Sequence, residues 1–175
     1  MTIRKSLPLL ATTALLTAGL SAPVSADAVS DFYKGKTVTV VVAAGPGGGH
    51  TKYTQYLAPF LEKHMAGNPS FIVQNMGGAG GTKAANFLYT RGLKDGTMIG
   101  ILLSDTPLAS RLRTTGVKYV AKEFQFLGGA DQPRSAFVVY KTTGVKSLDD
   151  AKKTQVILGS TGKGSQTYVL PTLVN

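Results

Sequence analysis

A glycine-rich loop between a predicted strand and a predicted helix is the part of this sequence best suited to chemistry. The β-branched run 38–44 stops at Gly45-Pro46-Gly47-Gly48-Gly49, and a helical pattern opens at His50 and Thr51. Glycines let the backbone approach a ligand closely, while the unpaired N–H groups and the dipole of a helix N-terminus favour an anion. The spacing therefore predicts an anion-binding loop.

The same arrangement recurs over residues 155–175. Residues 155–158 resemble a strand, 159–165 form a second loop of glycine, serine, threonine and lysine, and 166–175 have the composition of a helix. This second loop predicts a second anion site by the same physical reasoning. Two such sites on one chain favour a ligand with two negatively charged ends.

Enzymatic motifs that use similar loops fail on spacing. A phosphate-binding loop needs glycine where Ile157 stands and serine or threonine after Lys163. The dinucleotide fingerprint fails because His50 and Lys83 occupy its last glycine positions. No serine nucleophile motif occurs, and two histidines without cysteine give no recognisable metal site. We therefore expect a protein that is not an enzyme, with no catalytic residues, cofactor or metal.

The N-terminal residues predict export. Arg4 and Lys5 precede an uncharged, mostly apolar stretch over 6–20, and small residues follow. This pattern is typical of a secretory signal peptide, which we assign to residues 1–26, with cleavage after Ala26 or Ala28. The sequence has no cysteine, so disulfides cannot contribute to its stability.

The charge of the chain favours anionic partners but not nucleic acid. The formal net charge is +10. Lysine and arginine are scattered, however, and never exceed two in a row, as at Lys152-Lys153. No basic patch interleaved with aromatic residues occurs, so we expect no nucleic-acid partner. A solvated basic surface is the simpler interpretation of this charge.

Strands and helices are predicted to alternate after the first loop. Strands are expected at 71–75 and 97–103, and a helix at 82–89. The order strand, helix, strand, helix, strand predicts a parallel sheet with right-handed crossovers. In the helix after the first loop, apolar side chains recur at spacings of three and four, and this face is expected to pack on the sheet. Its members are Tyr53, Tyr56, Leu57, Phe60, Leu61 and His64.

The regular alternation of predicted strands and helices ends near residues 104–114, where we place a domain boundary. Residues 32–108 are assigned to a first α/β lobe, and 109–175 to part of a second. Strands are predicted at 126–129 and 136–140. Ser147 is expected to cap a short helix that runs through Lys153.

A family resemblance rests on short motifs that occur in order from about residue 32 to 175. They are Gly45-Pro46-Gly47-Gly48-Gly49, Gly67-Asn68-Pro69, Ile72-Val73-Gln74-Asn75-Met76, Gly78-Ala79-Gly80-Gly81, Lys83-Ala84-Ala85-Asn86-Phe87-Leu88-Tyr89, Lys94-Asp95-Gly96-Thr97 and Gly159-Ser160-Thr161-Gly162. Together they resemble the substrate-binding receptors of tripartite tricarboxylate transporters, also called Bug receptors. The resemblance implies a two-lobed clamshell like that of periplasmic binding proteins. It also implies a monomer in the periplasm that closes on a small organic acid and delivers it to membrane permease subunits.

The resemblance also implies which residues bind the ligand. Backbone amides of one loop from each lobe would hold the carboxylates, and residues after the third strand would line the cleft. The implied set is Gly47, Gly48, Gly49, His50, Thr51, Ser104, Asp105, Thr106, Ser160, Thr161, Gly162, Lys163, Gly164 and Ser165. His50 contacts the ligand, caps its helix or faces solvent, and Lys163 either contacts the ligand or is an ordinary exposed lysine. The run 77–81 is more simply a tight turn.

Two departures from the family pattern bear on the ligand. Thr51 stands where the family often has an acidic residue, and Gly77 stands where a proline is common. Without that acid a ligand ammonium group lacks its natural partner, so we expect a di- or tricarboxylate whose carbon backbone is hydroxylated or otherwise uncharged. The alternative from another class is an exported α/β hydrolase fragment that acts on an anionic ester.

The length of the chain predicts a truncated receptor. Two lobes of about 100 to 150 residues each would need roughly twice the residues that follow the signal peptide. We expect most of the first lobe, with its βαβαβ order, and only the start of the second. Uncovered sheet edges and helix faces would then make the chain marginally stable.

Overall fold

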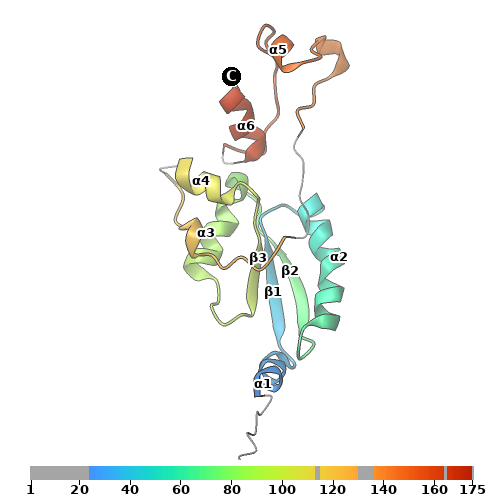
Figure 1. Cartoon of the computed structure of the whole chain (residues 1–175), viewed down its shortest axis with the longest axis vertical. Coiled ribbons are helices and arrows are strands. Elements are labelled where there is room, and N and C mark those ends of the chain that lie inside the picture. Colours follow the sequence, from blue (N-terminus) through green and yellow to red (C-terminus); the bar gives the residue numbers. More distant parts are fainter. Residues whose placement is uncertain (1–23, 113–114, 130–135, 164, 175) are drawn as a thin grey trace, which may run out of the picture.

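The computed structural model describes residues 24–112, 115–129, 136–163 and 165–174, and it shows an α/β fold built on a parallel sheet (Figure 1). The sheet has three strands in the order β2-β1-β3. Their bounds are Thr37–Val42 for β1, Ser70–Asn75 for β2 and Met98–Ile101 for β3. The three strands predicted over 38–103 and their parallel pairing are confirmed. Most of the predicted signal peptide lies outside the described residues.

The register brings the carboxyl ends of the strands to one edge of the sheet. Val42 of β1 pairs with Asn75 of β2 and with Ile101 of β3. Strand β1 is central, and Val38, Val40, Val41 and Val42 are at most 2% exposed. A strand buried on both faces needs apolar side chains on both, which explains its run of valines. The loops that leave this edge are therefore positioned by a rigid core.

Four helices accompany the sheet among the described residues; the second and third follow the predicted alternation, whereas the first and fourth were not predicted. Helix α1 covers Val24–Tyr33, α2 Gly49–His64, α3 Thr82–Arg91 and α4 Thr106–Leu112. Figure 1 shows α2 and α3 on either side of the sheet. Ala84, Ala85 and Leu88 of α3 are buried. Leu88 packs with Val41 and Ala43 in the main core cluster.

The face of α2 that packs on the sheet differs from the predicted one. Thr51, Thr54 and Ala58 are the buried residues of this helix. Tyr53, Tyr56 and Phe60 are 54%, 77% and 64% exposed, so the prediction that they pack on the sheet is wrong. The small side chains let the helix axis approach the sheet closely. At 3.6 residues per turn this places the aromatic positions on the opposite side.

The turn before β3 contains a carboxylate with two hydrogen bonds. Asp95 Oδ1 accepts from the backbone N of Thr97 at 2.9 Å and from its Oγ1 at 2.6 Å. The Thr97 hydroxyl is the larger cause and its backbone N–H the next, and together they lower the pKa of Asp95 below its ordinary value.

This geometry predicts the titration of Asp95. The pKa of the Asp95 carboxyl group is lower in the folded chain than in the unfolded chain, so the ionised carboxylate stabilises the fold at pH values above the ordinary carboxyl pKa. This stabilisation is lost as the pH falls through the folded-state pKa. Carbon-detected NMR titration of the unmodified chain and of Thr97→Val measures the Asp95 midpoint in each. The midpoint should be higher in Thr97→Val, because that variant lacks the hydroxyl that donates to the carboxylate. Equal Asp95 midpoints in the two chains would contradict the geometry.

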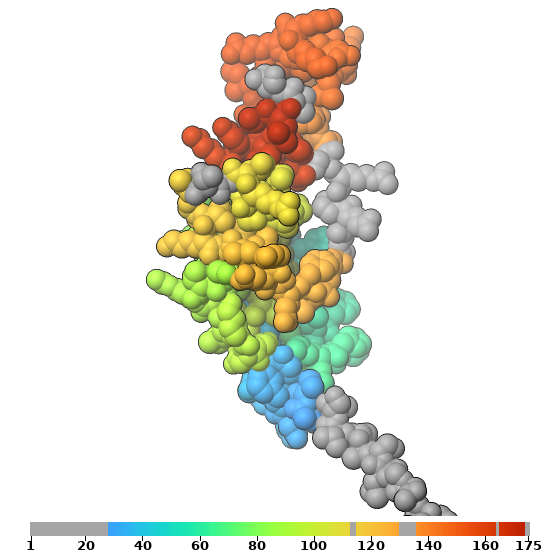
Figure 2. Space-filling model, turned by 60° about the vertical axis from the view of Figure 1, so that its left-hand side comes forward, coloured from blue at the N-terminus to red at the C-terminus, as the bar shows by residue number. Residues whose placement is uncertain are grey.

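The described chain after α4 contains short elements. Helix α5 covers Leu148–Ala151, α6 covers Gln166–Val174, and 3₁₀ turns occur at Ala121–Glu123 and Lys141–Thr143. The predicted cap is confirmed, because Ser147 Oγ accepts from the N–H of Asp150 at 3.1 Å. The predicted helix at 166–175 is confirmed as α6. Figure 2 shows α6, in red, against the yellow region of α4.

Three strands predicted in this half of the chain are absent. Residues 126–129, 136–140 and 155–158 form no strand, and Phe126, Leu127 and Ile157 are 86%, 79% and 94% exposed. A strand exists only where a neighbour accepts and donates its backbone hydrogen bonds. Within the described residues, only β1, β2 and β3 pair with one another. Favourable composition therefore did not produce strands here.

Candidate functional site

The first glycine loop leaves β1 at the carboxyl edge of the sheet and leads into α2. Gly47 has a φ of 81°, a conformation that glycine adopts at little cost, and Gly48 is the residue before the helix. Gly47, Gly48, Gly49 and His50 are exposed. The first N–H groups of this 16-residue helix have no acceptor within the helix itself. The loop therefore presents donors and a positive dipole end at the sheet edge.

Thr51 has a structural contact in this loop. Its side chain is 2% exposed, and its Oγ1 donates to the carbonyl of Gly45 at 2.9 Å. The same hydroxyl accepts from Asn75 Nδ2 at 2.6 Å, and Asn75 also donates to the carbonyl of Ala44 at 3.1 Å. The carboxamide at the end of β2 thus holds the first loop. No local pattern in the sequence indicates this role of Asn75, since its partners are distant in sequence and no spacing rule connects them.

Removal of the Asn75 carboxamide should destabilise the fold. Asn75→Ala leaves the Ala44 carbonyl and the Thr51 hydroxyl without this donor, at an expected cost of about 1–3 kcal/mol in the free energy of unfolding. Urea denaturation followed by circular dichroism measures the change. Gln74→Ala is the matched control, because Gln74 is the exposed neighbour on the same strand. The same loss in both variants would contradict the proposed role of Asn75.

The loop after β2 packs directly on the first loop. A Cβ placed on Gly77 would lie 3.0 Å from the backbone N of Gly45. Gly81 precedes α3 with a φ of 84°, and a Cβ there would lie 2.9 Å from Leu103 Cδ1. Neither glycine therefore leaves room for a larger side chain: the backbone of Gly45 occupies the space at Gly77, and the side chain of Leu103 occupies it at Gly81. Residues 77–81 form the predicted tight turn, part of which is the 3₁₀ segment Ala79–Gly81.

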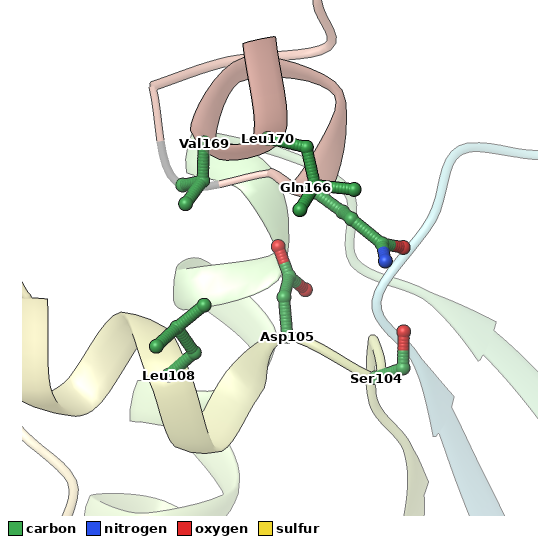
Figure 3. A pocket seen from close by; sticks show the side chains of 6 residues that line it. All are labelled: Ser104, Asp105, Leu108, Gln166, Val169 and Leu170. Atoms are coloured by element: carbon green, nitrogen blue, oxygen red, sulfur yellow. The ribbon is translucent and has the colours of Figure 1, made fainter. Parts of the chain in front are cut away.

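The loop after β3 contributes Ser104, Asp105 and Thr106. Thr106 is 8% exposed, and its Oγ1 donates to the carbonyl of Leu103 at 2.7 Å. The carbonyl of Asp105 accepts a hydrogen bond from the N–H of Ala109 at 2.8 Å, and this bond lies in the first turn of α4. The Asp105 side chain is 7% exposed and points toward α6 (Figure 3). Ser104 remains exposed at the end of the loop.

The second predicted loop contacts the turn after β2. A Cβ on Gly162 would lie 3.2 Å from the backbone N of Gly80, so the two loops pack closely. Gly162 has a φ of 139°. Ser160 Oγ accepts from the Gly162 N–H at 3.1 Å, and Ser165 Oγ donates to the Gly162 carbonyl at 2.8 Å. These two hydroxyls shape the loop itself.

The other residues of the second loop differ in exposure. The N–H of Thr161 donates to Thr167 Oγ1 at 3.2 Å. Ser165 is 3% exposed, while Thr161 and Lys163 are exposed. Gly164 lies outside the described residues. Lys163 is therefore the residue of this loop whose charge is accessible to an anionic ligand.

A pocket of about 300 Å³ lies between α4 and α6 (Figure 3). Its lining residues are Ser104, Asp105, Leu108, Gln166, Val169 and Leu170. The Asp105 carboxylate and the Gln166 carboxamide are the longer polar groups, and leucine and valine form the apolar walls. The pocket adjoins the loop after β3, as expected for ligands in open α/β sheets. The predictions included Ser104 and Asp105 but no residue of α6, because its packing on α4 is tertiary.

The structure thus brings the two predicted loops together through a third. The turn over 77–81 contacts Gly45 on one side and Gly162 on the other. Gly47, Gly48, Gly49 and His50 remain exposed beside it, whereas the hydroxyls of Thr51, Thr106 and Ser165 bond within their own loops. Backbone N–H groups, rather than these hydroxyls, are the donors that a ligand could use.

Comparison with models of protein families, with curated proteins and with solved structures finds no match. Among the described residues no three His, Asp or Glu side chains are grouped so that they could hold a metal ion. No described helix has the length and apolar character needed to span a membrane.

Proposed function

We propose that this chain is an extracytoplasmic receptor that binds a small di- or tricarboxylate and delivers it to a tripartite tricarboxylate transporter permease. The observation that carries the proposal is the convergence of glycine loops at one edge of a parallel sheet. The contact of Gly162 with Gly80 joins the second loop to the loops that leave the strands. A ligand at this edge would meet main-chain donors from two separate parts of the chain.

The charges near this edge support an anionic ligand. Lys163 and His50 are exposed on the two loops, and a lysine ammonium attracts a carboxylate without a fixed geometry. The pocket beside Asp105 favours a different chemical group of the ligand from the one that Lys163 favours. Its carboxylate accepts hydrogen bonds, so a ligand hydroxyl fits there better than a third carboxylate. This combination supports the hydroxylated di- or tricarboxylate expected from the sequence.

The remaining properties of the proposal follow from the family resemblance. The protein would act as a monomer in the periplasm after removal of residues 1–26, with no enzymatic activity and no cofactor. Residues 32–108 would form one lobe of a clamshell and 109–175 would belong to the other. Closure of the lobes around the acid would create the surface that the permease subunits recognise.

Ligand-dependent thermal unfolding tests the proposed function. A panel of succinate, malate, citrate, glutamate and sulfate is added to the purified chain. A ligand that binds only the folded state stabilises it by RT ln(1 + [L]/Kd), or about 2.7 kcal/mol at a hundredfold excess over Kd. We expect the hydroxylated acids to raise the unfolding temperature and sulfate to have little effect. Turnover of a chromogenic phosphate or carboxylate ester would instead favour the hydrolase alternative.

Lys163 provides a variant test of the same proposal. Lys163→Gln removes a positive charge near the ligand and should weaken di- or tricarboxylate binding by about three- to tenfold, as expected for a partly screened ion pair. Titration calorimetry measures the affinity. Lys153→Gln is the control, because it removes an exposed charge from outside the loop. Equal affinities for the two variants would remove Lys163 from the binding site.

A further inference from the structure

The outward face of α2 carries aromatic side chains where a solvated helix carries polar ones. Tyr53, Tyr56 and Phe60 are 54%, 77% and 64% exposed. Their spacings of three and four residues place them on one stripe, since successive residues of a helix are rotated by about 100°. The buried residues Thr51 and Thr54 lie on the opposite side. We call the set Tyr53, Tyr56 and Phe60 the outer stripe.

The charges beside the outer stripe are positive. Lys52 and Lys63 are exposed near the two ends of α2, and helical spacing places Lys52 beside Tyr56 and Lys63 beside Phe60. The only acid of the helix is Glu62, and its Oε1 accepts from the backbone N of Phe71 at 2.8 Å. That carboxylate is therefore directed toward β2. Within the described residues, the outer stripe and the two lysines thus form an aromatic surface whose positive charge no acid of α2 compensates.

We propose that the outer stripe docks on an anionic phospholipid surface. Phenyl and phenol rings partition into the boundary between headgroups and acyl chains, and lysine side chains beside them interact with anionic headgroups. The outer side of a single helix is convex, so it fits a deformable planar surface better than it encloses a peptide. Figure 1 shows α2 at the right-hand margin of the molecule, with the sheet on its inner side.

Docking of this kind is peripheral. The α2 side chains that hold the sheet stay in place, while the rings of the outer stripe enter the lipid headgroup region. Binding should therefore depend on anionic lipid and weaken as salt screens the lysines. The proposed ligand loop reaches only the first turn of α2, whereas Tyr56 and Phe60 lie further along the helix, so we expect docking without ligand.

Single-cysteine labelling tests the proposal at individual positions. The chain has no cysteine, so Tyr56→Cys, Phe60→Cys, Gln55→Cys and Leu127→Cys each give one attachment site for a polarity-sensitive fluorophore. Vesicles of phosphatidylglycerol and phosphatidylcholine should shift the emission to the blue at positions 56 and 60. Gln55 lies off the outer stripe and Leu127 is exposed elsewhere, so these positions should show no shift. Binding through another segment would not produce this pattern.

A charge variant completes the test. Lys52→Glu with Lys63→Glu, in the chain labelled at position 60, should weaken the response to anionic vesicles by about tenfold or more. Lys141→Glu with Lys153→Glu is the matched control for net charge and should have a much smaller effect. Three outcomes overturn the proposal: equal shifts at all four labelled positions, equal loss in the two charge variants, or a response to polyglutamate but not to vesicles. The last outcome would assign the outer stripe to an acidic protein partner.

Discussion

Gly81→Ala is expected to lower the free energy of unfolding by about 2–5 kcal/mol. The residue has a φ of 84°, which costs an alanine about 1–2 kcal/mol. Its new methyl group would also lie 2.9 Å from Leu103 Cδ1 and 3.5 Å from Ala43 Cβ, and such overpacking costs about 1–3 kcal/mol. Both terms act at the point where α3 meets the core. Urea denaturation in the absence of ligand measures the sum.

Gly47→Ala distinguishes the cost of the positive φ from the cost of overpacking. Gly47 has a similar φ of 81°, but no atom lies within 4 Å of the position of its Cβ. This variant should lose only the conformational part, about 1–2 kcal/mol. Equal losses at positions 81 and 47 would show that Leu103 moves aside freely. In that case the contact between the turn and the core would have little importance for stability.

The second large effect concerns the contact between the second ligand loop and the turn after β2. Gly162→Ala would place a methyl group 3.2 Å from the backbone N of Gly80, at a φ of 139° that alanine rarely adopts. The neighbouring atoms are backbone, so the loop over 160–165 must move as a whole. If main-chain donors from both loops bind the acid, its affinity should fall by about tenfold or more, equivalent to about 1.4 kcal/mol.

Gly159→Ala is the control for this loop. Gly159 has no atom within 4 Å of its Cβ position and does not have a positive φ. Titration calorimetry with the acid that stabilises the unmodified chain should find nearly unchanged affinity for this variant. If Gly162→Ala also binds with unchanged affinity, the second loop does not hold the ligand. Thermal unfolding of each variant without ligand distinguishes lost affinity from lost folding.

The first half of the fold could be predicted because local signals agree there. Runs of β-branched residues end at glycines, and each glycine loop is followed by a helical period, so the order of β1 to β3 and of the helices between them is specified locally. The burial of β1 follows from its valines. The cap at Ser147 was also predictable, since it involves residues three apart in sequence.

The predictions failed where the outcome depends on tertiary packing. Tyr56 and Phe60 have the spacing of a buried face, but periodicity does not state how closely a helix approaches its sheet. Thr54 and Ala58 allow the closer approach, and they determine which face is buried. Ile157 has high strand propensity, but propensity cannot supply a hydrogen-bonded neighbour.

The candidate site was predicted in part for the same reason. The glycine loops are local features, and the sequence located them at the ends of strands. The bond from Asn75 to Thr51 and the contact from Gly162 to Gly80 join residues far apart in the chain. Their existence depends on the register of the sheet and on the packing of loops, which no local pattern encodes.

The central position of β1 also has a consequence for synthesis. This valine-rich strand is made before either of its partners, so the nascent chain carries an uncharged β-forming segment that has nothing to pair with. Such segments are prone to intermolecular association. Lys34 and Lys36 immediately precede it and act as gatekeepers, because their mutual repulsion between neighbouring chains opposes aggregation until translation delivers β2 and β3.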